Sequence, residues 1–415
     1  MNQQQPKRVL LAVLTLFVAL SPLFAQDEAS EDDIFAEGAF DQTLTASQTS
    51  AETTKLTWLG GVSVLSDTSL LIPSDRQAYG AQSLVSGKGF LKADKPDTGQ
   101  FFVSYSFGHT WLTSTNDSVF KTAFQLAQPS LDTPKFQLSE VYLSFDVSKI
   151  LFVRLGNQLV NWGSAFFWSP ADFINQRPAD SQAAIDIRTG KPGLRLHLPV
   201  GVGNVFLFGD LSQTLNAAGA PQDLIEKGSV AARIDTTLWG FNIGVQGSYG
   251  KSSKPQAGAT FSGRLLGFDL WGEYGATVPL NDYTYSWAAS LGGEKSLDDF
   301  TLRFEAFENP DGKSDTELTG LVLANFVPFR WGQQYVFASL SKTKLLTDAI
   351  DGSVSTIANL SDLSYTATAS LSVRLPKTLP FSLSVGYNGG PTNREFTLRV
   401  PPGSFTLGLK SVLEL

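Results

Sequence analysis

The residues best suited to contact a solute are gathered in one stretch of the chain, from 154 to 178. Aromatic rings in this stretch can stack on the flat face of a sugar or another ring, and its Asp, Asn and Arg side chains can form hydrogen bonds and ion pairs. Because so many rings would be costly in water, we expect this segment to be buried against the protein. The candidate residues are Trp162, Phe166, Phe167, Trp168, Asp172, Asn175 and Arg177.

A second set of polar residues recurs at alternate positions of segments that otherwise carry apolar side chains. Such residues can form a wall of opposed charges that orders water and polarises a passing solute, or they can pair across neighbouring strands and hold that wall together. Both signs of charge are present, so the pattern predicts no preference for anions or cations. The candidate wall residues are Glu140, Arg154, Gln158, Arg195, Arg233, Asp269, Glu273, Arg303, Glu305 and Arg374.

Residues for metal binding or covalent catalysis are scarce. The chain has two histidines, His109 and His197, and no cysteine, and neither histidine has the spacing of a metal-ligand motif. The sequence therefore predicts no metal site, no cofactor and no enzymatic activity. One alternative stays open, because a His near a carboxylate or Ser can act in catalysis, and His109 stands beside Thr110 and Trp111.

The elements that must position these residues have a period of two. Segment 141–147 alternates Val, Leu, Phe and Val with Tyr, Ser and Asp, and segment 381–388 alternates Phe, Leu, Val and Tyr with Ser, Ser, Gly and Asn. Successive side chains of a strand point to opposite faces, so each segment predicts a strand with one apolar face and one polar or small face. About eighteen strands are expected by this pattern, with sixteen as the alternative. They lie near 55–65, 81–93, 100–111, 136–148, 150–160, 193–199, 204–212, 229–237, 239–249, 257–265, 268–277, 284–294, 299–308, 318–328, 333–343, 363–375, 380–389 and 404–415.

Strand length and the connections indicate the fold class. Segments of about ten residues suit tilted membrane strands and are long for a soluble β-sandwich. Outer-membrane barrels have short periplasmic turns and longer outer loops, and lipid offers no hydrogen-bond partner to an open sheet edge. We therefore predict an all-β fold, a transmembrane up-and-down antiparallel β-barrel over residues 55–415, with both ends in the periplasm and one loop folded inward. Long connections are expected near 112–135, 161–192, 213–227 and 344–361, and short ones near 148–149, 200–203, 236–238, 265–267, 296–298, 329–332 and 376–378.

The first 54 residues have a different character. Lys7 and Arg8 precede an apolar run that extends from Val9 to about Phe24, and Ala25 is followed by acidic residues. This arrangement is typical of a secretory signal peptide, which we assign to residues 1–25; the run is shorter than the roughly 20 apolar residues of a membrane-spanning helix. Residues 26–54 are expected to form an acidic, flexible periplasmic leader that serves solvation and assembly or, alternatively, plugs the barrel.

The charge of the chain is distributed unevenly. The formal net charge is −8, but residues 26–55 hold eight carboxylates and one lysine, so the acidity belongs to the leader. The nearly balanced remainder argues against nucleic-acid binding, which needs a basic surface. Phe occurs 30 times although no later apolar run is long enough for a membrane helix, so the apolar residues must be spread over strand faces that meet outer-membrane lipid.

The last segment of the chain is amphipathic in the same way. Leucines 407, 409, 413 and 415 share one face with Phe405, and Thr406, Gly408, Lys410 and Glu414 share the other. This segment resembles the C-terminal assembly signal of outer-membrane barrels, which implies the barrel-assembly machinery as a partner. Leu415 stands where that signal usually has an aromatic residue.

The stretch from Arg154 through Gly156 and Gln158 to Trp162 and Gly163, followed by a loop with Pro, Asp and Asn, resembles porin-like outer-membrane families. These include the phosphate-selective and alginate-export porins. The resemblance implies that the loop folds into the lumen and narrows the pore, with the seven candidate residues named first at or near the constriction. The basic ladder of a phosphate-selective pore is not evident, so the resemblance indicates no substrate.

The predicted strand count leads to a predicted function. Barrels of 16 to 18 strands leave an aqueous channel, whereas eight strands fill their own interior. The sequence thus predicts a porin, a passive diffusion channel for small hydrophilic solutes with a loop constriction. Two alternatives remain: an outer-membrane transporter specific for hydrophobic substrates or for sugars, and a structural or adhesive surface barrel. A homotrimer is compatible with the sequence, although no feature requires one.

Overall fold

The computed structural model describes residues 55–74, 80–114, 135–175, 188–215, 227–251, 253–280, 283–314, 329–374, 380–398 and 402–414. Its strands are β1 (Thr57–Ile72), β2 (Gly80–Lys95), β3 (Gly99–Ser114), β4 (Lys135–Val147), β5 (Leu151–Gln158), β6 (Lys191–Val200), β7 (Gly203–Asp210), β8 (Ser229–Leu238), β9 (Phe241–Gly250), β10 (Ser253–Leu265), β11 (Phe268–Thr277), β12 (Ser286–Leu297), β13 (Phe300–Glu308), β14 (Gln334–Lys342), β15 (Ile350–Asn359), β16 (Ser364–Val373), β17 (Phe381–Gly389) and β18 (Ser404–Glu414). Two short helical segments accompany them, α5 (Ser212–Leu215) and η3 (Glu395–Thr397).

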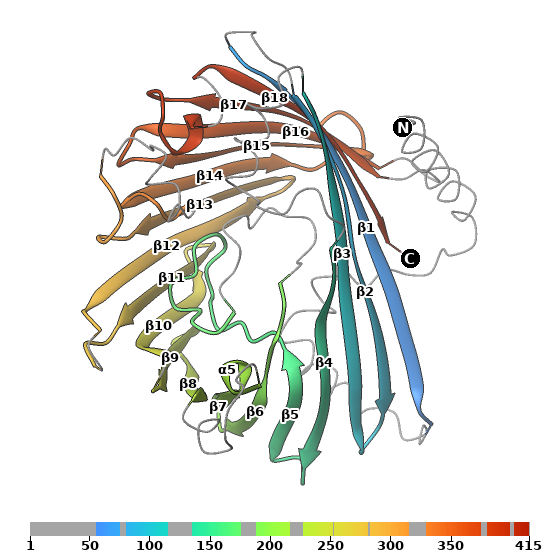
Figure 1. Ribbon diagram of the computed structural model, residues 1–415, viewed down its shortest axis with the longest axis vertical. Helices are drawn as coiled ribbons and strands as arrows, with labels where there is room; N and C mark the ends of the chain where they lie inside the picture. The colour runs from blue at the N-terminus through green and yellow to red at the C-terminus, as the bar shows by residue number, and fades with distance from the viewer. Residues whose placement is uncertain are drawn as a thin grey trace, which may run out of the picture.

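The described strands close into one barrel. Every strand pairs antiparallel with its neighbours in sequence, and β1 also pairs with β18, which gives an 18-stranded closed sheet (Figure 1). In that last pairing Ser63 lies opposite Glu414 and Ile72 opposite Phe405, so the start of β1 and the end of β18 lie at the same end of the barrel. Closure satisfies the backbone hydrogen bonds that an open sheet edge would leave exposed to lipid.

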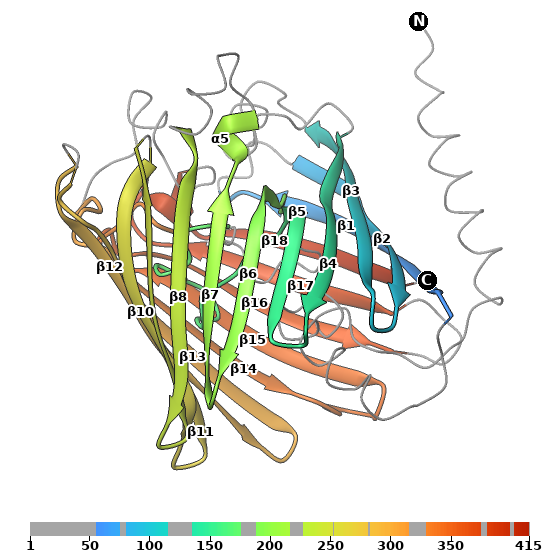
Figure 2. The same cartoon turned by 90° about the horizontal axis from the view of Figure 1, so that it is seen from below.

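The two ends of the barrel differ in their connections. At the end where β1 begins, tight turns join the strands, as Figure 2 shows for the hairpins of β8 to β11. In two of these turns both central residues have positive φ, 51° and 80° at Trp239–Gly240 and 53° and 78° at Leu266–Gly267. Positive φ at both positions is the geometry of the tight hairpin turn whose twist matches the flanking strands. The opposite end carries the long connections, including 159–190, 309–333 and 390–403.

The two strand faces have opposite environments. On β9 the Val245 side chain is 62% exposed and points outward, whereas the neighbouring Gln246 is 3% exposed and points inward. Exposed Leu, Val, Ile and Phe side chains recur on the outward positions of the other strands, which is the surface expected to meet lipid. Among the described residues, no helix is long and apolar enough to cross a membrane.

The predicted fold class and the count of eighteen strands are confirmed, but individual predictions were wrong. The predicted long connection at 344–361 contains β15, and only residues 343–349 join β14 to β15. The predicted short join at 329–332 belongs to the long connection between β13 and β14. The strand predicted at 318–328 lies outside the described residues, as do the predicted signal peptide and leader.

Candidate functional site

The connection between β5 and β6, residues 159–190, turns into the barrel, and we call it the inward loop. Figure 1 shows its described part, in green, inside the ring of strands beside β11. Residues 159–175 and 188–190 of this loop are described. The loop lies against the inward faces of β7 to β14, which we call the covered wall.

Two buried carboxylates of the covered wall hold the loop backbone. Glu273 on β11 accepts hydrogen bonds from the backbone N–H groups of Ser164, Ala165 (2.6 Å) and Ala171 (3.1 Å), and the Ser169 hydroxyl lies 2.9 Å from one of its oxygens. Several donors around one carboxylate satisfy its oxygens and offset part of the cost of burying them. Glu273 was predicted as a wall residue, and here it fixes the first half of the loop.

Glu305 on β13 holds the next turn of the loop in the same manner. It accepts hydrogen bonds from the backbone N–H groups of Phe166 (2.9 Å), Phe167 (3.1 Å) and Trp168 (2.6 Å). The indole N–H of Trp271 donates a fourth, at 2.7 Å. Glu305 is 1% exposed, so its carboxylate serves the loop rather than solvent.

A third predicted wall residue also contacts the loop. The Arg233 guanidinium on β8 donates to the carbonyl of Trp162 and to Gln246 Oε1 (2.6 Å), and it pairs with Asp235 at 3.1 Å. Gln246 in turn donates its amide to the carbonyl of Ala171. Side chains from β8, β9, β11 and β13 therefore fix one short segment of backbone.

Two glycines allow the loop to approach this closely. A Cβ atom on Gly163 would lie 1.7 Å from Ser169 Oγ, and one on Gly275 would lie 2.0 Å from the carbonyl oxygen of Pro170. Any side chain at these positions would force the loop away from the wall.

Most of the predicted constriction residues are buried in this packing. Phe167 and Trp168 are 2% and 0% exposed and belong to one apolar cluster, in which the Trp168 ring stacks on Phe307 at 5.5 Å and Phe167 stacks on Phe337 at 5.6 Å. Trp162 is buried in a second cluster, whose other members are Val160, Ile174, Phe206, Phe208 and Ala231. Both clusters pin the loop to the covered wall.

The polar residues of the loop have structural partners. Asn175 accepts from the Val160 N–H (2.9 Å) and donates to the Thr189 carbonyl (3.0 Å), which joins the two described ends of the loop. Asp172 is fully buried, and its Oδ2 atom lies 4.0 Å from Nη1 of Arg188. Arg177 lies outside the described residues.

Phe166 differs from these residues because it remains partly exposed. The Arg303 guanidinium from β13 lies 3.9 Å from the centre of its ring, and Arg303 is paired with Glu294 on β12. This stacked pair forms part of the surface that the covered wall presents to the lumen.

The remaining predicted wall residues fall into two groups. Four of them are buried on β4 to β6, namely Glu140, Arg154, Gln158 and Arg195. Glu140 accepts the Leu159 N–H at 2.9 Å. The Arg154 guanidinium lies over the Tyr142 ring, and that of Arg195 lies over the Phe206 ring. Asp269 and Arg374 lie at the end with tight turns and form exposed ion pairs, with Arg264 at 2.8 Å and Asp351 at 2.5 Å. Their contact with a solute stays a prediction.

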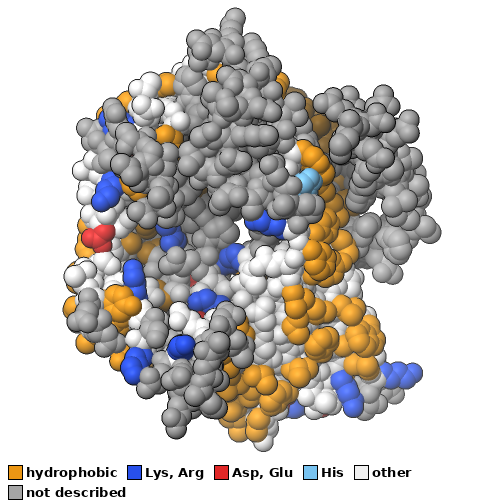
Figure 3. All heavy atoms as spheres, viewed as in Figure 1, with side chains coloured by type: hydrophobic (Ala, Val, Ile, Leu, Met, Phe, Trp, Pro, Cys, Tyr) orange, Lys and Arg blue, Asp and Glu red, His pale blue; other side chains and the backbone are white. Residues whose placement is uncertain are grey.

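The inward side of β15 to β18, which we call the open wall, carries small hydroxyl side chains of intermediate exposure. Two pairs hydrogen-bond across strands, Ser353 with Ser370 (2.7 Å) and Ser372 with Ser382 (2.8 Å). In the space-filling view, Lys and Arg side chains gather around the central hollow, while apolar side chains lie along the outer side (Figure 3). The other inward hydroxyls of intermediate exposure on this wall are Ser355, Thr366, Thr368, Ser384 and Thr406. The inward Ser364 and Ser404 are fully buried, and Asp351 and Lys410 are charged residues on the same face.

Solved structures resemble this arrangement. The outer-membrane protein opdK from Pseudomonas aeruginosa has a TM-score of 0.53 at 11% identity, with 86% of this chain and 99% of that chain covered. OccAB4 from Acinetobacter baumannii has a TM-score of 0.51 at 10% identity, with 88% and 100% covered. The fold is that of an outer-membrane protein. No family model matches the chain, and no curated protein matches its sequence. The specific likeness to phosphate-selective and alginate-export porins stays a prediction.

A set of functional residues in the other long connections was not predicted from the sequence. In the 309–333 connection, Phe329 accepts the Trp168 indole N–H on its carbonyl at 2.7 Å. Its own N–H donates to Glu395 in η3, a carboxylate that is 8% exposed. Burial raises the pKa of Glu395 to about 7, against hydrogen bonds from Tyr335 and Phe329 that lower it.

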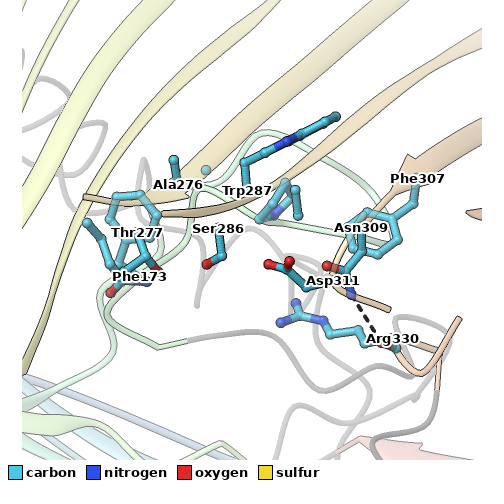
Figure 4. A pocket seen from close by; sticks show the side chains of 13 residues that line it. Phe173, Ala276, Thr277, Ser286, Trp287, Phe307, Asn309, Asp311 and Arg330 are labelled. Carbon is cyan, nitrogen blue, oxygen red and sulfur yellow. Dashed lines mark hydrogen bonds between the residues drawn. The ribbon is translucent and has the colours of Figure 1, made fainter. Parts of the chain in front are cut away.

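A pocket lies between the inward loop, β10 to β13 and the described residues of the 309–333 connection. Figure 4 shows Asp311 and Arg330 directed into the same space, with Phe173 and Phe307 on its two sides. Burial lowers the pKa of Arg330, and the carboxylates of Asp172 and Glu273 oppose that shift.

No group of three or more His, Asp or Glu side chains that could hold a metal ion occurs within the described part of the chain. The two histidines pack against aromatic rings: His109 lies edge-on to Trp111 at 4.2 Å, and His197 stacks on Phe206 at 4.4 Å. His197 also shares a hydrogen bond with Asn204 at 2.9 Å.

Proposed function

We propose that this chain forms an outer-membrane channel for the passive diffusion of small hydrophilic solutes, narrowed by the inward loop. The observation that carries the proposal is the unequal filling of the barrel. Four wall strands hold the loop through Arg233, Gln246, Glu273 and Glu305, whereas β15 to β18 keep short hydroxyl side chains of intermediate exposure. A barrel of this strand number encloses more space than its own side chains fill.

The passage then runs between the loop and the open wall. In this proposal the buried residues Trp162, Phe167, Trp168, Asp172 and Asn175 set the constriction indirectly, by fixing the loop. Phe166 and Arg303 bound the passage from the loop side. Residues 1–25 direct secretion, residues 26–54 precede the barrel in the periplasm, and the barrel-assembly machinery inserts the chain, with a trimer as one assembly to test.

Planar-bilayer recording of the purified, folded protein tests this function. We expect steady single-channel conductance in KCl, and a larger conductance when residues 162–175 are replaced by a short Gly/Ser linker. Heat-modifiable gel mobility checks that each barrel is folded. A folded barrel without conductance would exclude the channel and favour a structural role. If the loop variant conducted like the native protein, the channel function would stand, but the inward loop would not be its constriction.

A further inference from the structure

Three connections at the outer end of the barrel meet at Phe329. Its carbonyl accepts the Trp168 indole N–H from the inward loop at 2.7 Å, and its N–H donates to Glu395 in the 390–403 connection. Its ring lies 5.5 Å from Phe167 and 5.7 Å from Phe396. Phe329 is thus a bridge from the η3 segment to the loop that narrows the lumen.

The Phe329 backbone is strained in this position. Its φ is 59°, a left-handed value that a bulky side chain rarely adopts. Strained residues persist only where the surrounding contacts hold them. Here the contacts that hold the backbone are the hydrogen bonds on either side of the residue, to Glu395 and from Trp168.

Glu395 is the centre of the holding contacts. One carboxylate oxygen accepts the Phe329 N–H, and the other accepts the Tyr335 hydroxyl at 2.6 Å and the Asn359 amide at 2.8 Å. The Glu395 N–H donates to Asp362 at 3.0 Å, which ties η3 to the turn between β15 and β16. The carboxyl group is therefore shared by strands β14 and β15 and by two connections.

We propose that Glu395 is a proton-operated latch, which holds Phe329 and the inward loop when it is protonated and loosens them when it is ionised. The latch rests on the proposed channel function and adds regulation of the same constriction. Its elements are the buried carboxyl group, the strained bridge residue and the loop that the bridge contacts.

The direction of the switch follows from the surroundings of the carboxyl group. Tyr335 on β14 and Asp362 beside β16 are its titratable neighbours, β15 contributes the uncharged Asn359, and the cations adjacent in sequence are Arg330 beside Phe329 and Arg394 beside Glu395. Burial, reinforced by the Asp362 charge, raises the pKa of latched Glu395 to about 7 from 4.5, despite the hydrogen bonds it accepts.

The difference between the pKa of Glu395 in the latched and released states determines the pH range over which the latch responds. A released Glu395 faces water and keeps the ordinary value of 4.5, so the latched state binds more protons between 4.5 and about 7. The ratio of latched to released molecules falls as pH rises through this window, by at most about tenfold per pH unit, and is constant above and below it. Protons therefore tighten the outer mouth.

Single-channel recording between pH 4.5 and 8.5 in KCl tests the latch. In the native protein we expect fluctuations of the open level to become more frequent as pH rises and to level off above about pH 7. Glu395→Gln carries no charge at any pH and should show the quiet, low-pH behaviour throughout. Glu308→Gln is the matched control, because it removes a carboxylate at the outer end of β13 whose hydrogen-bond partner is Gln334 on β14, and it should keep the native pH response.

Thiol labelling gives a second readout that needs no conductance. The chain has no cysteine, so Thr397→Cys in η3, at a buried position, and Thr392→Cys, at an exposed position, can each be labelled alone with a maleimide. The labelling rate of the buried site relative to the exposed one should rise with pH when Glu395 is present and stay constant when it is Gln. A ratio independent of pH, together with native fluctuations equal to those of Glu395→Gln, would overturn the latch while leaving the channel intact. A folded barrel silent at every pH would overturn the channel itself.

Discussion

The covered wall and the open wall belong to one sheet with one alternation of faces, yet their inward residues have different tasks. On the covered wall, Glu273 and Glu305 are buried and each accepts backbone N–H groups from the inward loop. On the open wall, the serines of β15 to β17 are short and bond to one another across strands. The covered wall holds the inward loop in the lumen, and the short side chains of the open wall leave space beside that loop.

This difference shows that a polar residue facing a lumen does not by itself indicate contact with a solute. The charges of the covered wall are directed at peptide groups of the loop, where ionised acceptors form strong hydrogen bonds. Neutral hydroxyls on the open wall can exchange hydrogen bonds with water at small cost. Mutations on the covered wall should therefore change the position of the inward loop, and mutations on the open wall should change the width of the passage directly.

The largest effect is expected from Glu305→Ala. It leaves the N–H groups of Phe166, Phe167 and Trp168 and the Trp271 indole without this acceptor. Each buried donor left without a partner costs about 1–3 kcal/mol, so the loop should detach and single-channel conductance should rise. Glu308→Ala on the same strand is the control and should leave conductance unchanged. Native conductance in a folded Glu305→Ala barrel would show that the carboxylate does not hold the loop.

The open wall is tested by two arginines placed one residue apart on β17. Val385, at the middle of β17, points outward and is 47% exposed, so Val385→Arg puts a charge toward lipid and should lower the free energy of unfolding by about 2–4 kcal/mol. Ser384→Arg points inward, should fold normally and should reduce conductance by occupying the passage. Urea titration followed by gel mobility measures the first effect, and bilayer recording measures the second. If both variants folded alike and conducted alike, the assignment of the two faces would be wrong.

A smaller change at the covered wall is Gly163→Ala. The added Cβ would lie 1.7 Å from Ser169 Oγ and 2.8 Å from Glu273 Oε1, so the loop must shift. Overpacking of this kind costs about 1–3 kcal/mol, and we expect a lower unfolding midpoint with a broadened distribution of conductance levels. Gly209→Ala on β7 is the control, because a Cβ there meets its nearest neighbour at 4.0 Å. Equal behaviour of the two variants would argue against close packing of the loop.

The sequence allowed the barrel to be predicted because alternation repeats along most strands. It failed at β15, where the outward face carries Gly352 and Thr356 beside Val354, and the inward face carries the apolar Ile357. A strand that mixes polar and apolar residues on each face shows no clear alternation, so the sequence pattern predicts a loop there.

The candidate site was predicted in its position but not in its contacts. Alternation placed Arg233, Glu273 and Glu305 on the inward face, yet their partners are peptide N–H and carbonyl groups, which have no signature in sequence. Glu395 lies in a segment rich in Gly, Pro and Asn, where an acidic residue is usually solvated, and only the fold brings Tyr335 and Asn359 around it. Long-range burial of a charge is a tertiary property that local pattern does not encode.

The smallest expected effect comes from a pair of serines, one on the inward loop at the covered wall and one on the open wall. Ser169 is fully buried and its hydroxyl lies 2.9 Å from a Glu273 oxygen, so Ser169→Ala removes a charge-assisted hydrogen bond and should cost about 1–3 kcal/mol. Ser370 shares a 2.7 Å hydrogen bond with Ser353 at a half-buried position, where water can replace the lost partner, so Ser370→Ala should cost at most about 0.5 kcal/mol. Urea unfolding of the two variants in parallel measures the difference. Equal destabilisation would mean that both walls are packed to the same degree, and the space assigned to the passage would then have to be occupied.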